Sequence, residues 1–100
     1  MMEKRRVAIT GVGAFTPIGQ SAHESWQAVK AGKCGIGPIT LFDTSAQKVK
    51  LAAEVKDFVP EEHLDKRDVR KMDRFTQFAV AASVQAMEDS HLNLEAEDRT

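Results

Sequence analysis

Apolar positions along the chain fall into three patterns, which predict a buried strand near the start and two helices. The first pattern is the run Val7-Ala8-Ile9 within residues 6–10. It lacks the polar alternation of a half-exposed strand, which indicates burial on both faces. Gly11 and Gly13 end the run. A strand of this kind needs neighbouring strands with which it can pair.

The second pattern predicts a helix over residues 22–31. Ser21 is a good N-cap residue, and Glu24 follows three positions later, which is the spacing of a capping box. Gly32 suits the position just after the last helical turn, where a left-handed residue ends many helices. One face of this helix is apolar, and we expect Trp26 on that face to lie in the core.

The third pattern predicts one continuous helix over residues 68–90. Apolar or small residues recur there at spacings of three and four, as on the core-facing stripe of a helix. The stripe consists of Val69, Met72, Phe75, Thr76, Ala79, Val80, Ser83, Ala86 and Met87. Alanines keep the middle of this helix thin, so we expect that another element can approach it closely.

The stretch between the two predicted helices, residues 33–58, combines turn-forming glycine and proline with short runs of alternating apolar positions. This pattern predicts a hairpin or an irregular excursion. One buried strand and two helices do not complete a sheet. We therefore expect residues 1–100 to be the opening part of a larger α/β protein, without an internal domain boundary.

Composition and charge narrow the class of protein. The 100 residues are 42% hydrophobic and 29% charged with a formal net charge of −1, so no overall field attracts nucleic acid or an anionic membrane. The apolar run at residues 7–9 is too short for a signal-peptide core or a membrane span. The single cysteine, Cys34, fits no Cys/His metal pattern. We expect a soluble, cytoplasmic protein without a metal site.

The loop from Gly11 to Gly19 follows a predicted strand and precedes a helix, which is the setting of a nucleotide site. Gly11 and Gly13 begin a dinucleotide fingerprint, but Thr16 stands where its third glycine belongs. The helix begins only after Ser21, whose side chain would already cap the N–H groups that a pyrophosphate needs. No Gly-Lys-Ser/Thr follows, which excludes a P-loop. A nucleotide site is therefore the least favoured alternative.

Three collinear blocks resemble the opening of the β-ketoacyl-acyl carrier protein synthases, and the synthase II type in particular. The blocks are RRVAITGVGAFTPIGQSAHESWQAVKAGKCGIGPITLFD from Arg5, AAEVKDF at residues 52–58 and RKMDRFTQFAVAAS at residues 70–83. The resemblance extends over nearly the whole chain. It implies the N-terminal part of a thiolase-like α-β-α-β-α layered fold, in an enzyme that is a homodimer when complete.

The resemblance also implies a reaction, the decarboxylating Claisen condensation of fatty-acid elongation. An acyl group held on a cysteine is joined to malonyl-acyl carrier protein, whose phosphopantetheine arm delivers the substrate, so no cofactor is expected. The cysteine, two histidines and lysine of the family would lie beyond Thr100, and we expect the chain alone to be inactive.

The cysteine and histidines of this chain do not fit the catalytic roles of the family. Cys34 follows the C-terminus of a predicted helix, where the helix dipole disfavours a thiolate. His23, His63 and His91 match no family histidine, and none has a cysteine partner at a fixed spacing. No residue of this chain is therefore predicted to be catalytic.

A cluster of basic residues lies around the start of the second predicted helix. It consists of Lys66, Arg67, Arg70, Lys71 and Arg74. Cations near a helix N-terminus oppose the macrodipole, and like charges four residues apart repel, so local stability does not account for the cluster. The resemblance implies that it docks the acidic acyl carrier protein. Arg67, Arg70 and Lys71 are the best matches, with Lys66 and Arg74 as weaker neighbours.

Other interpretations stay open at this point. Asp65, Asp68 and Asp73 interleave with the basic residues and could neutralise them as a solvated face. A polyketide-type ketosynthase, or its non-catalytic partner subunit, would share this opening and differ at the downstream nucleophile. A stand-alone module that binds carrier protein without chemistry would fold cooperatively at this length.

Overall fold

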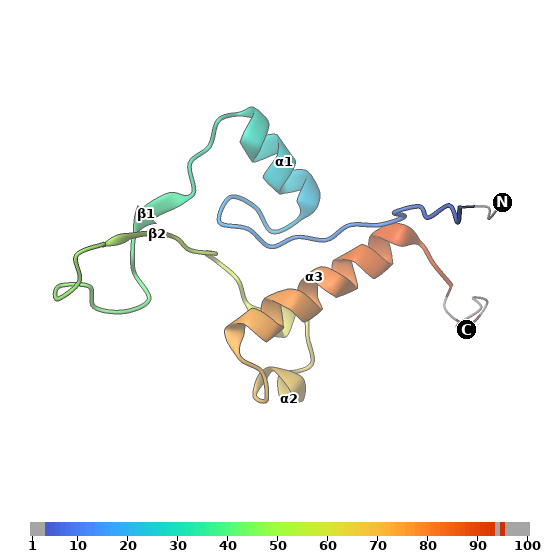
Figure 1. The fold of residues 1–100 in the computed structure, drawn as a ribbon. Coiled ribbons are helices and arrows are strands. Elements are labelled where there is room, and N and C mark those ends of the chain that lie inside the picture. The colour runs from blue at the N-terminus through green and yellow to red at the C-terminus, as the bar shows by residue number, and fades with distance from the viewer. Residues whose placement is uncertain (1–3, 94, 96–100) are drawn as a thin grey trace.

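The computed structural model describes residues 4–93 and residue 95. Its elements follow in the order α1 (Ala22–Lys30), β1 (Ile36–Pro38), β2 (Leu51–Ala53), η1 (Pro60–Glu62), α2 (Lys66–Val69) and α3 (Arg74–Ser90). Figure 1 shows the hairpin of β1 and β2 at one end of the molecule and α2 projecting below α3. The predicted first helix and the predicted hairpin are both confirmed.

Helix α1 has the caps that its sequence predicts. The Ser21 hydroxyl accepts a hydrogen bond from the Glu24 N–H at 3.0 Å. The Glu24 carboxylate accepts from the Gln20 N–H at 2.9 Å, so the return bond of the capping box is displaced by one residue. At the other end Gly32 has a φ of +72°. Gly32 and Lys33 close a Schellman motif with N–H···O distances of 3.0 and 2.9 Å.

Strands β1 and β2 pair in the antiparallel sense, with Gly37 opposite Ala52. Glu54, just after β2, binds the chain that leaves β1. Its carboxylate accepts from the Thr40 N–H at 3.1 Å, the Thr40 hydroxyl at 3.0 Å and the Leu41 N–H at 3.2 Å. Burial would raise the pKa of Glu54, but these hydrogen bonds outweigh it and hold that pKa below its usual 4.5.

The N-terminal segment corrects the predicted buried strand. Residues 6–10 are extended, but they form no strand with any other described residue. Val7 is 90% exposed and Ile9 is 86% exposed. The side chains are apolar on both faces as predicted, and both faces are open because no neighbouring strand from the described chain covers them.

The second predicted helix is divided in two. α2 ends at Val69, a turn follows over residues 70–73, and α3 begins at Arg74. The predicted stripe is also only partly correct. Ala81, which lies outside it, is 1% exposed, whereas Phe75 within it is 72% exposed. Much of the stripe borders an open apolar groove of 370 Å³ lined by Ala79, Val80, Ser83, Val84, Met87 and Glu88.

The core of the described chain is small and aromatic. Phe58 is 7% exposed and makes edge-to-face contacts with two other rings. The ring centroids are 5.0 Å apart for Phe15 and 4.8 Å apart for Phe78. His63 stacks on Phe58 at 5.7 Å. We call these four residues the aromatic cluster. Trp26, predicted in the core, is instead 58% exposed, and helix α1 has no buried residue.

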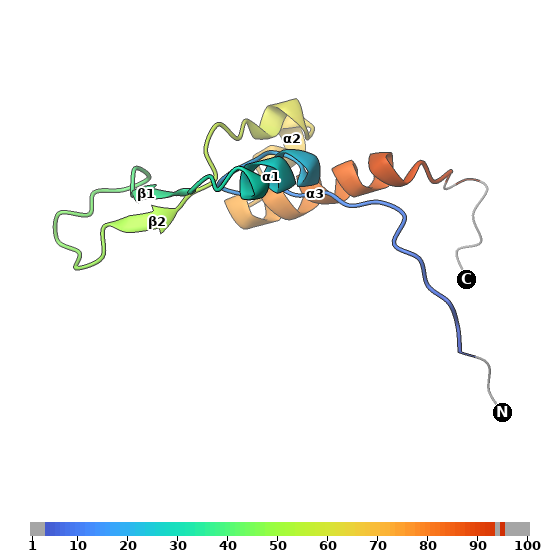
Figure 2. The same ribbon diagram turned by 90° about the horizontal axis from the view of Figure 1, so that it is seen from above.

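The molecule is elongated, with principal extents of 60 × 36 × 27 Å (Figure 2). Its radius of gyration is 17.8 Å, against about 13 Å for a compact domain of this length. Its accessible surface is 8521 Å², against roughly 5,600 Å² for a compact monomer of this mass. Within residues 4–93, no helix is long and apolar enough to cross a membrane.

Candidate functional site

The glycine loop packs directly on α3. A Cβ atom on Gly11 would overlap the carbonyl oxygen of Ala86, and one on Gly13 would overlap the carbonyl oxygen of Ala82. The two glycines therefore permit a backbone-to-backbone contact with the thin, alanine-rich part of the helix. This contact gives the loop a packing role that the sequence did not reveal.

The backbone N–H groups of the same loop are occupied by side chains of α3. The Val12 N–H donates to Asp89 Oδ2 at 3.0 Å, and the Ala14 N–H donates to Gln85 Oε1 at 3.0 Å. A phosphate-binding loop needs such N–H groups free to face its ligand. The geometry therefore supports the rejection of a nucleotide site.

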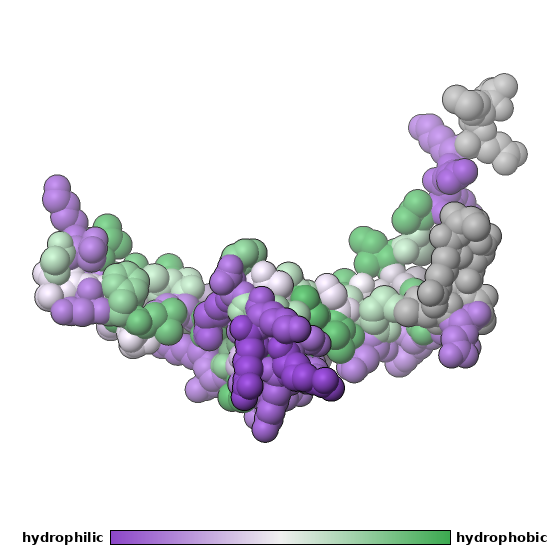
Figure 3. Space-filling model, turned by 90° about the horizontal axis from the view of Figure 1, so that it is seen from below, coloured by the Kyte–Doolittle hydropathy of each residue, from purple (hydrophilic) through white to green (hydrophobic). Residues whose placement is uncertain are grey.

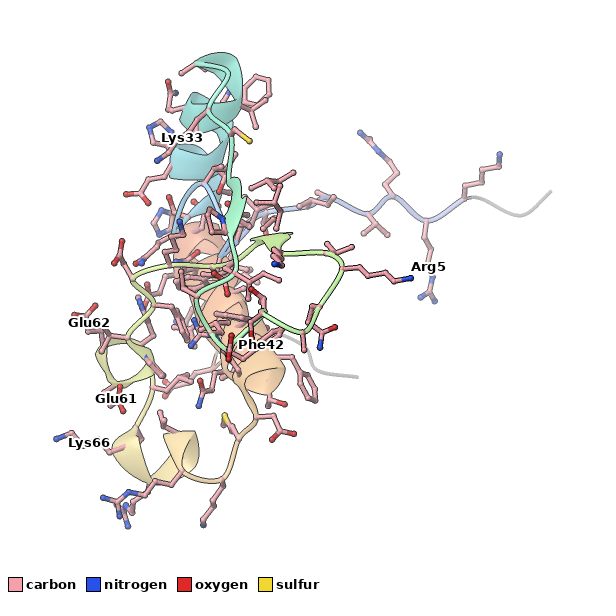
Figure 4. The ribbon with its side chains drawn as sticks, turned by 90° about the vertical axis from the view of Figure 1, so that its left-hand side faces the viewer. Arg5, Lys33, Phe42, Glu61, Glu62 and Lys66 are labelled. Carbon is pink, nitrogen blue, oxygen red and sulfur yellow. The ribbon has the colours of Figure 1, made fainter. Side chains whose placement is uncertain are left out.

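Four of the five predicted docking residues lie together on one exposed segment. Lys66 and Arg67 belong to α2, Arg70 is its C-cap, and Lys71 is in the turn that follows; all four side chains are exposed. We call residues 66–71 the basic segment. Figure 3 shows a strongly hydrophilic projection over α2, and Figure 4 shows Lys66 pointing away from the body of the molecule.

The neighbouring carboxylates do not form ion pairs with the basic segment. Asp65 is the N-cap of α2, and its Oδ1 accepts from the Arg67 N–H at 2.9 Å. Throughout the described part of the chain, no basic nitrogen lies within 4.0 Å of a carboxylate oxygen. Glu61 and Glu62 of η1 are nearby and project beside the segment (Figure 4). The cations of the basic segment are therefore open to an external partner.

Arg74, the fifth predicted docking residue, faces a different environment. Its guanidinium lies 5.0 Å from the ring centre of Phe78 and 5.8 Å from that of Phe58. Arg74 Nη2 also donates to the carbonyl oxygen of Val55 at 3.1 Å. The structure therefore separates Arg74 from the basic segment and places its charge on the aromatic cluster.

Two contacts near the basic segment were missed from the sequence. Gln77 Nε2 donates to the carbonyl oxygens of Val69 at 3.3 Å and Met72 at 3.4 Å. His63 packs between Phe15 and Phe58, and its buried Nε2 has no hydrogen-bond partner. No periodic pattern includes Phe15, Phe58 or His63, so a sequence signal for this cluster was lacking.

Cys34 occupies the position that was predicted for it, and two of the histidines lie at helix ends. Cys34 is exposed and follows the C-terminal cap of α1, with its Sγ 3.9 Å from the Ile36 carbonyl oxygen. His23 lies in the first turn of α1, and His91 ends α3 with a φ of 57°. Among the described residues, no group of His, Cys, Asp or Glu side chains has the arrangement of a metal site.

Known proteins match the chain over nearly its whole length. Residues 4–100 match the family model described as "Beta-ketoacyl synthase, N-terminal domain". The 3-oxoacyl-(acyl-carrier-protein) synthase 2 of Synechocystis sp. is 50% identical over 91 residues, which are 91% of this chain and 22% of that protein. The protein of the same name from Coxiella burnetii is 50% identical over 93 residues, 93% of this chain and 22% of its own length.

The fold has a counterpart among solved structures. "The ishigamide ketosynthase/chain length factor" has a TM-score of 0.80 and 38% sequence identity, over 93% of this chain and 23% of that chain. This likeness confirms the predicted fold class, an α/β segment from the opening of the layered fold. The chain spans less than a quarter of the length of each of these relatives.

Proposed function

Because the chain belongs to the β-ketoacyl synthase family, whose N-terminal domain it matches, we propose that it is the opening segment of a 3-oxoacyl-acyl carrier protein synthase of type 2. The complete enzyme is a cytoplasmic homodimer. It condenses an acyl-enzyme thioester with malonyl-acyl carrier protein, with loss of carbon dioxide, in fatty-acid elongation. The 50% identity to synthases of this name, against 38% identity to the solved ketosynthase/chain length factor, supports this assignment.

In this proposal, residues 4–93 supply scaffold and part of the carrier-docking surface. We expect the catalytic cysteine, histidines and lysine of the family in the part of the relatives that this chain does not span, so residues 4–93 are proposed to contribute no catalytic residue. No cofactor takes part, since the carrier's own phosphopantetheine arm brings the substrate.

The observation that carries the docking role is the exposed, unpaired charge of the basic segment. Four cations lie within residues 66–71 on a projection of the surface. A charged surface of this kind steers encounter with an acidic protein and sets its register, while affinity stays modest and release stays fast. Such binding suits a carrier that must leave after each delivery.

The experiment uses a chimera in which residues 1–100 replace the matching segment of the Coxiella burnetii relative. Arg70→Glu with Lys71→Glu reverses two charges of the basic segment. We expect the KM for acyl carrier protein to rise about tenfold at low salt and less at high salt, because exposed charges are screened. The KM for a small thioester should change little.

A matched control reverses the same number of charges elsewhere. Lys48→Glu with Lys50→Glu alters the loop between β1 and β2, which lies apart from α2 (Figure 1), and should leave the KM for the carrier unchanged. If both double variants raise this KM equally, or if neither does, the basic segment is not the docking surface.

A further inference from the structure

We infer that Arg74 and Gln77 are positioning residues, which hold the basic segment in the orientation needed for carrier docking without contacting the carrier. The inference rests on the proposed docking role of residues 66–71. It assigns to Arg74 a role different from the direct docking contact that the family resemblance implies.

The basic segment requires support from outside itself. Helix α2 has four residues and none of them is buried. A helix of this length is unstable in isolation, because its few internal hydrogen bonds do not offset the entropy of ordering it. Its orientation must therefore be set by contacts at its two ends.

The first end is fixed through His63, two residues before the Asp65 cap. Its ring lies 6° from parallel with Phe58 and at 72° to Phe15. The chain that enters α2 is thus attached to the aromatic cluster. This leaves the exit of α2 as the point where the direction of the basic segment is decided.

Gln77 fixes the exit of α2 from the first turn of α3. Its side-chain amide donates to the carbonyl of Val69, the last residue of α2, and to the carbonyl of Met72 in the turn. These carbonyls lie at a helix end and in a turn, where helical partners are missing. One side chain therefore joins α2, the turn and α3.

Arg74 fixes the same turn against the rest of the molecule. A cation as the first residue of α3 opposes the helix dipole, so its position is not explained by helix stability. Its guanidinium instead lies over Phe58 and Phe78 and donates to Val55 beyond β2. These cation–π contacts and the charge-assisted bond connect the turn to the hairpin and the aromatic cluster.

The test measures the carrier KM of the chimera at low and high salt for Arg74→Ala, Arg74→Lys and Gln77→Ala. We expect each variant to raise this KM about three- to tenfold at low salt and by a smaller factor at high salt, because the charge contacts that the misplaced basic segment makes with the carrier are screened. Lysine retains the charge but not the planar fork, so Arg74→Lys should resemble Arg74→Ala. Amide exchange over residues 66–73 should become faster in all three.

The control is Gln47→Ala, which alters an exposed glutamine in the loop between β1 and β2 and should not change the carrier KM. The inference is overturned if Gln77→Ala has no effect on the carrier KM. It is also overturned if Arg74→Lys restores the KM that Arg74→Ala raises, because the charge of Arg74 alone would then account for its effect and Arg74 would contact the carrier directly.

The double charge reversal of Arg70 and Lys71 separates this inference from the proposed function. If that variant raises the carrier KM and the Arg74 and Gln77 variants do not, docking stands and the positioning role fails. If the charge reversal itself has no effect, both the docking surface and its positioning residues are rejected.

Discussion

Gly11 and Gly13 lie where a glycine-rich motif would bind a nucleotide, yet each is used for contact with a helix. Their missing Cβ atoms let the loop backbone reach the carbonyls of Ala82 and Ala86. The thin middle of the helix and the glycines of the loop are two halves of one contact. Both features can be recognised in the sequence, but residue spacing does not show that the loop and the helix pack against each other.

Replacing Gly13 with alanine tests this contact. The added methyl group would overlap the Ala82 carbonyl, so we expect a loss of about 1–3 kcal/mol in the free energy of unfolding, which denaturant titration of the chimera would measure. Gly37→Ala is the matched control, because the nearest atom to its added Cβ is Lys56 Nζ at 4.0 Å. Equal free energies of unfolding for the two variants would show that the loop does not pack closely against α3.

At the scale of elements, the sequence predicted the ends of helix α1 correctly, but it did not predict where the second helix breaks or which of its faces is buried. Ser21 and Gly32 cap α1 as the sequence indicates, because capping depends on residues a few positions apart. The break over residues 70–73 was not predicted, since apolar spacing continues across the turn. Which face of α3 is buried was missed as well, because that depends on the loop that packs against it.

We expect the stability of the hairpin to depend on pH through the carboxyl group of Glu54. The pKa of this carboxyl is lowered in the folded chain, so its contribution to stability is present above the usual value of 4.5 and is lost as the pH falls through the lower, folded value. We expect the amides of Thr40 and Leu41 to lose protection in that range, as amide NMR of the chain would show.

Glu54→Gln supplies the control for this titration. The variant keeps an acceptor oxygen and removes the ionisable group, so protection of Thr40 and Leu41 should be weaker at neutral pH and no longer depend on acid. Protection that is unchanged by acid in the unsubstituted chain would show that the carboxylate does not hold the hairpin.

At the scale of the whole molecule, the described chain leaves its main apolar surfaces open. Val7 and Ile9 are exposed on the unpaired N-terminal segment, and Phe75 is exposed at the start of α3. The sequence predicted that this strand needs neighbours, which the described residues do not provide. The relatives are more than four times as long, and we expect their remaining parts to cover equivalent surfaces. These surfaces argue against a stand-alone binding module.

Condensation by the chimera that carries residues 1–100 in the Coxiella burnetii relative tests the central claim most directly. The measurement is the rate at which acyl-acyl carrier protein and malonyl-acyl carrier protein form the 3-oxoacyl product. We predict a dimeric chimera with a kcat within about tenfold of the unaltered relative, a barrier difference of about 1.4 kcal/mol. A chimera that folds as a dimer and forms no product would contradict the claim that this chain is the opening segment of a condensing enzyme.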